Sequence, residues 1–205
     1  MDMNRLIPKI GSAIVTVTVF LFALFLIIGF SFGYFFVCAI LPIGFIIMTA
    51  GFYHEADEDR KVPAVIGIAL SAVYCVLILL VYFAQITTVR TSDLNEEASR
   101  IIDFSKGGLI FNYDLLGYGM MALSTFFTGL AFRAKNKPDK WLKALLMIHG
   151  LFFPGCFIMP MTGMFEKMSD GGTSSGGVIA LVCWCVYFLP IGILAFLHFG
   201  RKEKE

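Results

Sequence analysis

Long apolar segments constrain this chain more than any other feature of its sequence. Hydrophobic residues make up 58% of its 205 residues and charged residues 15%, whereas a soluble domain has roughly 45–50% and 25%. A helix needs about 20 apolar residues to cross the hydrocarbon core of a bilayer. The chain has enough apolar sequence for six such helices, which predicts an all-α polytopic membrane protein built as a bundle of six transmembrane helices.

Polar and proline-containing stretches mark the ends of the predicted spans. We expect one transmembrane domain over residues 1–205, with a tight turn at Gly29 to Gly33 and a short surface helix between Asp93 and Phe104. Pro154 and Pro160 are expected to kink the fifth span, and the Gly/Ser-rich stretch 166–177 is expected to form a flexible loop. The six predicted spans are 11–29, 33–53, 63–89, 110–132, 141–164 and 178–199.

The distribution of basic residues predicts the orientation. With the N-terminus in the cytoplasm, twelve of the sixteen Lys and Arg residues fall in cytoplasmic segments, which leaves Arg90, Arg100, Lys106 and Lys167 outside. The positive-inside rule therefore predicts that both termini lie in the cytoplasm. The basic loop 133–143 adjoins a span, so anionic lipid head groups are its expected partner, and nucleic acid is not.

The richest group of polar side chains lies where the third span ends and the fourth begins. Asp114 falls about one turn inside the fourth span, and ionisable residues within spans are functional candidates. Arg90 is its obvious ionic partner. One interpretation is a structural clamp between these two residues, and the other is a pocket for a small polar or cationic ligand between spans three and four. The candidate ligand-binding residues are Tyr82, Gln85, Arg90, Asn112, Asp114 and Tyr118.

Deeper in the same two spans, polar and small residues recur at helical spacing. Ser71 and Tyr74 belong to this stripe in the third span, and Thr125 and Thr128 belong to it in the fourth. Polar groups in lipid must be satisfied by protein or water, so both stripes should face the interior. Interhelical packing without a ligand explains this deeper part.

The histidines form a second group to consider. His149 lies within the fifth span and is a candidate proton-titrating group, whereas His54 and His198 lie at the cytoplasmic ends of spans two and six. A metal site or an intramembrane hydrolase could be built from them, but the sequence has no H-E-x-x-H motif. No catalytic residue, metal ligand or cofactor is predicted. The five cysteines all lie in apolar runs and are expected to be packing residues.

A short sequence that occurs twice in the chain could indicate an internal repeat. Leu41-Pro-Ile-Gly44 in the second span recurs as Leu189-Pro-Ile-Gly192 in the sixth. Six spans divide into three plus three, as in the inverted repeats of many transporters. A four-residue match leaves open whether the repeat is real.

The run from Asp114 to Ala131, with Tyr82-Phe-Ala-Gln85 before it and Trp141 to Gly150 after it, resembles a group of small bacterial six-helix membrane proteins of unassigned function. The resemblance covers spans three to five. It implies a bacterial cytoplasmic membrane location and brings no activity with it.

Three functional hypotheses follow from these features. The first is a small-ligand binding carrier or sensor with an outward-facing polar site between spans three and four. The second is a non-catalytic accessory or structural membrane subunit, which would form a homo-oligomer or pack against a partner subunit. The third is an intramembrane metal-dependent hydrolase. We expect a binding protein rather than an enzyme.

Overall fold

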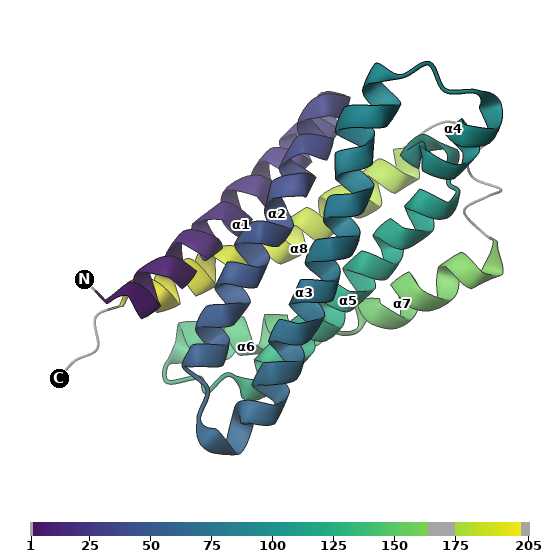
Figure 1. The fold of residues 1–205 in the computed structure, drawn as a ribbon. Helices are drawn as coiled ribbons and strands as arrows, with labels where there is room; N and C mark the ends of the chain where they lie inside the picture. The colour runs from purple at the N-terminus through teal and green to yellow at the C-terminus, as the bar shows by residue number, and fades with distance from the viewer. Residues whose placement is uncertain (1, 164–174, 202–205) are drawn as a thin grey trace.

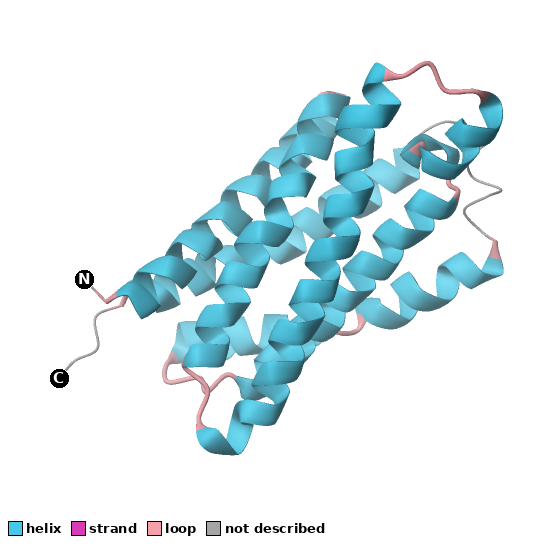
Figure 2. Cartoon of the chain, viewed as in Figure 1, coloured by secondary structure: helices cyan, strands magenta, loops and turns pink. Residues whose placement is uncertain are grey.

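A computed structural model describes residues 2–163 and 175–201 of the chain. Within these ranges the protein consists of helices and connecting loops, with no strand (Figure 2). Most of the predicted flexible loop 166–177 lies outside the described residues. The α-helices are α1 (Met3–Ile27), α2 (Ser31–His54), α3 (Lys61–Ala84), α4 (Glu96–Ile102), α5 (Leu109–Ala131), α6 (Lys137–His149), α7 (Phe152–Ile158) and α8 (Ser175–Gly200).

Five helical segments of the described chain are long and apolar enough to cross a membrane. The predicted all-helical membrane fold is confirmed at this level. The predicted fourth span forms as α5, but Asn112, Asp114 and several glycines make it less apolar, and it is not one of the five. The count of six spans therefore stays a prediction. The five segments are Met3–Ile27, Ser31–His54, Glu58–Val89, Lys137–Thr162 and Gly177–Gly200.

The long helices follow one another around the bundle (Figure 1). Helix α1 packs between α2 and α8, α2 packs on α3, α3 on α5, and α5 on both α6 and α7. Helix α6 completes the circuit by packing against α8. The start of α1 and the end of α8 lie together at one end of the bundle, which we call the terminal end. Helix α4 lies at the other end, which we call the α4 end. Toward the α4 end, α7 diverges from α8 (Figure 1).

The turn predicted at Gly29 to Gly33 forms at its first residue. Gly29 has a φ of 70°, a left-handed conformation that glycine adopts without steric cost. Helix α2 starts two residues later, at Ser31. The predicted surface helix is α4, whose first turn is capped because the Asn95 side chain accepts a hydrogen bond of 2.8 Å from the Ala98 N–H.

The fifth predicted span is broken instead of kinked. Helix α6 ends at His149, and α7 begins at Phe152 after a two-residue turn. Pro154 explains this position, because it has no N–H to donate to the carbonyl of Gly150 and its ring crowds that carbonyl. Pro160 falls in the first turn of a 3₁₀ helix, Met159–Thr162, where a missing N–H costs little.

The repeated Leu-Pro-Ile-Gly sequence has a packing explanation. Both of its glycines face α1, one from each side. A Cβ on Gly44 would lie 2.6 Å from the Ile14 side chain, and a Cβ on Gly192 would lie 2.6 Å from Thr16 Oγ1 and 3.2 Å from its backbone nitrogen. Small residues let helix backbones approach closely in membranes. The repeated sequence therefore marks the two faces on which α1 is held.

We predict that Gly44→Ala and Gly192→Ala each destabilise the protein by about 1–3 kcal/mol, the usual cost of overpacking. Unfolding in detergent micelles would measure it. Gly155→Ala is the matched control, because its Cβ would meet nothing closer than Met159 Sδ at 3.9 Å, and it should change stability by less than about 0.5 kcal/mol. Equal effects in all three variants would contradict this packing account.

Candidate functional site

A cavity of about 210 Å³ lies between α5, the α6–α7 segment and α8. It is predominantly apolar. Of the residues that the structure describes, Asp114 is the only acidic one on its wall, and no Lys or Arg lines it. Two of the six predicted ligand-binding residues, Asp114 and Tyr118, belong to this wall. The others that line it are Leu115, His149, Phe152, Cys156, Ala180, Leu181 and Trp184.

Asp114 is the most unusual side chain of the described chain. It lies in the second turn of α5 and is only 6% exposed. Its Oδ1 atom has no hydrogen-bond partner among the described residues. The Tyr82 phenol of α3 lies beside the carboxyl group. A buried carboxyl group with an unmatched oxygen costs free energy, so this position needs a reason to exist.

Aromatic rings and a thiol continue from Asp114 into the bundle interior. The Tyr118 hydroxyl lies 3.9 Å from Cys38 Sγ of α2. The Tyr118 ring makes edge contacts with Tyr74, at 5.8 Å between centroids, and with Trp184, at 5.3 Å. The Tyr74 hydroxyl is buried and, like Asp114 Oδ1, has no partner in the described structure. Unmatched polar atoms thus gather in this half of the bundle.

His149, the predicted proton-titrating group, lies at the inner wall of the cavity with both ring nitrogens occupied. Its Nε2 accepts from the Trp184 indole N–H at 3.1 Å, and an indole can only donate. Its Nδ1 must therefore carry the proton, which it donates to Thr125 Oγ1 at 2.8 Å. Thr125 in turn donates to the carbonyl of Ala122 at 2.8 Å. This arrangement fits a neutral ring, which would gain a proton only by releasing Trp184.

The remaining predicted site residues lie elsewhere. Gln85, in a π-helical turn at Gln85–Val89, donates to the carbonyl of Ile102 at 2.8 Å and accepts from the Phe104 N–H at 3.0 Å. It therefore fastens the α4 segment to α3. The Arg90 guanidinium lies over the Phe32 ring, 4.9 Å from its centroid, and does not form the ion pair with Asp114 suggested by the sequence. Asn112 is half-buried in the first turn of α5.

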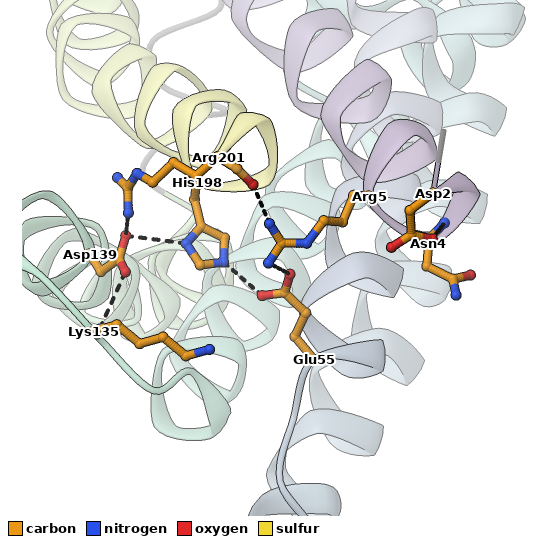
Figure 3. A network of polar contacts seen from close by, with 8 residues as sticks. All are labelled: Asp2, Asn4, Arg5, Glu55, Lys135, Asp139, His198 and Arg201. Atoms are coloured by element: carbon orange, nitrogen blue, oxygen red, sulfur yellow. Dashed lines mark hydrogen bonds and ion pairs between the residues drawn. The ribbon is translucent and has the colours of Figure 1, made fainter. Parts of the chain in front are cut away.

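The terminal end holds a charge network that sequence reasoning missed (Figure 3). His198 lies between two carboxylates: its Nε2 is 2.7 Å from Glu55 Oε2, and its Nδ1 is 3.2 Å from Asp139 Oδ1. Arg201 donates to the same Asp139 oxygen at 2.6 Å. Arg5 reaches Glu55 at 3.4 Å and also donates to the carbonyl of Arg201. The network joins α1, α2, α6 and α8.

Asp139 is 1% exposed and is held from its own helix as well. Its N–H donates to the Asn136 side chain at 3.0 Å, and its Oδ2 accepts from the Lys135 N–H at 3.2 Å. Asn-Lys-Pro-Asp is a helix-start pattern, with a capping Asn and a Pro in the first turn. This local pattern could have shown that Asp139 belongs to a helix start and not to the predicted basic loop 133–143.

A second cavity, of about 150 Å³, adjoins this network and is lined by Phe52, Phe132, Arg133 and His198 among others. Its acidic groups already have partners, since Glu55 pairs as above and Asp57 lies 3.0 Å from Arg133. This cavity is therefore a weaker candidate than the one at Asp114. Within the described ranges, no three His, Cys, Asp or Glu side chains are placed to hold a metal ion.

Comparison with family models, with curated proteins and with solved structures found no significant match. The functional argument therefore rests on the fold and the side chains. The protein has helices that are long and apolar enough to cross a membrane, and these place it in the class of helical membrane proteins. The candidate site is a half-open cavity with Asp114 on its wall, whose Oδ1 atom has no partner among the described residues.

We predict that Asp139→Asn destabilises the protein by about 3 kcal/mol, because removing one partner of a buried ion pair leaves the others uncompensated. Reversible unfolding in micelles would measure the loss. Glu96→Gln removes the same charge from the exposed pair with Arg100, at 2.8 Å on α4, and should cost about 0.3–0.5 kcal/mol. A cost at position 139 no larger than at position 96 would show that the network is not structural.

Proposed function

We propose that this protein is a small-ligand binding membrane protein, a carrier or a sensor, whose site is the cavity at Asp114. The observation that carries the proposal is a buried carboxyl oxygen without a partner on the wall of an otherwise apolar cavity. Ligand pockets are mainly apolar with a few polar groups that fix orientation. The first sequence hypothesis is thereby kept, with the site moved from between spans three and four to between α5, α7 and α8.

The contrast between the two buried aspartates supports this assignment. The Asp139 carboxylate meets a guanidinium, an imidazole and the backbone N–H of Lys135 at its helix start. A residue that serves stability is expected to be satisfied in this way. Asp114 has one neighbouring phenol, from Tyr82, and its Oδ1 atom has no hydrogen-bond partner among the described residues, although the residue lines the cavity. A group left unmatched at a free-energy cost is the expected state of one that pairs with a ligand.

The arrangement of the helices provides a route to the cavity. Helices α6 and α8 are joined by two hydrogen bonds, from Tyr187 to the Leu145 carbonyl at 2.6 Å and from Trp184 to His149 at 3.1 Å. Beyond this point α7 diverges from α8 (Figure 1). The cavity lies at that divergence, with Phe152 and Cys156 on one side and Leu181 on the other. A ligand would enter from the side, between these helices.

The membrane arrangement that goes with this proposal has six spans, with α5 as the fourth and both termini in the cytoplasm. Helix α5 is flanked by α3, α6 and α7, so its polar residues need not face lipid. The basic residues also support it, because Arg5, Arg60, Arg133, Lys143 and Arg201 all contact partners at the terminal end. By the positive-inside rule that end is cytoplasmic, and the cavity then lies in the outer half of the bundle.

We predict that a thermal-shift screen of small organic solutes against the protein in lipid nanodiscs finds a stabilising ligand. A solute at about 100 times its Kd stabilises a protein by about 2.7 kcal/mol. Leu181→Trp, which fills the cavity, should abolish the shift. Leu197→Trp is the matched control, because Leu197 is 49% exposed on the same helix and does not line the cavity, and it should leave the shift intact.

A shift that survives Leu181→Trp would place binding elsewhere and overturn the proposal. If no solute stabilises the folded protein, the gap between α7 and α8 is better explained as the seat of a partner helix. The accessory-subunit hypothesis would then take precedence.

A further inference from the structure

Resting on the proposed function, we propose that the ligand of the Asp114 cavity is a small organic monocation, an amine with one compact apolar group, held by Asp114 and by the aromatic faces beside it. The charge of the cavity wall, the aromatic residues on it and the cavity volume each support this ligand.

The charge of the cavity has one sign. Among the described residues, Asp114 is the only carboxyl group on its wall, and neither Lys nor Arg lines it. Arg90, the basic residue that the sequence suggested as the ionic partner of Asp114, lies over the Phe32 ring. A carboxylate in a cavity of low polarity attracts a cation strongly and repels an anion. An ammonium group also supplies several N–H donors, which match the acceptor-only character of the Asp114 carboxylate on the cavity wall.

The aromatic residues of the wall favour the same ligand. Tyr118, Phe152 and Trp184 line the cavity, and the face of an aromatic ring attracts a cation within about 6 Å of its centroid. The Trp184 ring is also fixed in orientation, because its N–H is bound to His149 at 3.1 Å and its ring stacks on Phe188 at 5.0 Å between centroids. A ring held in this way is preorganised and needs little ordering on binding.

The volume and the remaining wall limit the size of the ligand. A cavity of about 210 Å³ corresponds to about seven water molecules at ~30 Å³ each. Apart from Asp114, Tyr118 and His149, the wall consists of apolar side chains, a thiol and the Trp184 indole, whose N–H is already used. A second charge on the ligand would find no counter-ion there. The ligand is therefore a monoamine with one apolar group of about the size of a phenyl ring.

The chain itself provides a reporter for this inference. It contains two tryptophans, of which Trp184 lines the cavity and Trp141 is 68% exposed at the terminal end. In a Trp141→Phe variant in nanodiscs, fluorescence reports Trp184 alone. Three probes of nearly equal shape test the charge: 2-phenylethylammonium, 2-phenylethanol and propylbenzene, which end in an ammonium, a hydroxyl and a methyl group.

We expect 2-phenylethylammonium to change Trp184 fluorescence with a Kd about tenfold or more below that of the two neutral probes, as for a hydrogen bond to a charged group. Asp114→Asn in the same background should remove this preference and leave the neutral probes within about twofold, since their binding rests on apolar contact. Glu96→Gln, which removes a charge from the exposed α4, should change nothing.

Equal binding of the three probes, or tighter binding of the alcohol, would overturn the cation inference while the cavity remained a binding site. The absence of any response to all three probes would overturn it as well, and the solute screen with Leu181→Trp then decides the proposed function separately. If Asp114→Asn does not fold, the preference of the unmutated carboxyl group among the three probes still decides the question.

Discussion

A polar side chain inside a membrane has no water to pair with, and this constraint explains the place of α5 in the bundle. Lipid-embedded polar groups must find partners within the protein. The Ser124 hydroxyl donates to the carbonyl of Gly67 on α3 at 2.7 Å, and Thr125 pairs with His149 of α6. On the neighbouring helices, Thr49 donates to Ser71 at 3.0 Å. The helix with most polar residues is therefore the one with neighbours on several sides.

Asp114 departs from this rule, and the departure is informative because the rule is otherwise kept around it. The bundle is able to satisfy a buried carboxylate, as Asp139 at the terminal end demonstrates with three polar contacts. The difference between the two residues is therefore not a general failure of packing. It lies in what surrounds them: a helix start, a guanidinium and an imidazole for Asp139, and an apolar cavity for Asp114.

The sequence predicted the fold class and most helix ends because these depend on local signals. Apolar length predicted the long helices, Gly29 the first turn, and the polar residues around Asn95 the surface helix. Asp114 and Tyr118, which line the cavity, are visible as candidates without a structure because each is a polar group in an apolar run. The sequence suggested Arg90 as the ionic partner of Asp114, because the two residues lie at neighbouring span ends. In the structure, the Arg90 guanidinium lies over the Phe32 ring instead. Sequence spacing does not give the rotation of one helix about another.

The charge network was missed for the same reason. Arg5, Glu55, Asp139 and His198 come from four helices separated by long stretches of chain, and each alone looks like a solvated residue at a span end. Only Asp139 carries a local signal, through its capping Asn136. His149 was recognised as unusual, but its bonds to Thr125 and Trp184 come from two other helices. Contacts of this kind need the three-dimensional arrangement.

The break in the fifth predicted span connects the fold to the candidate site. Up to His149, α6 follows α8 and is bonded to it through Trp184 and Tyr187. After His149 the chain turns at Gly150 and Leu151, and α7, which carries Pro154, packs on α5 as α6 does. The cavity lies where α7 separates from α8, with Phe152 and Cys156 on one side and Leu181 on the other. The turn ahead of Pro154 is therefore the point at which the fifth predicted span and the candidate site meet.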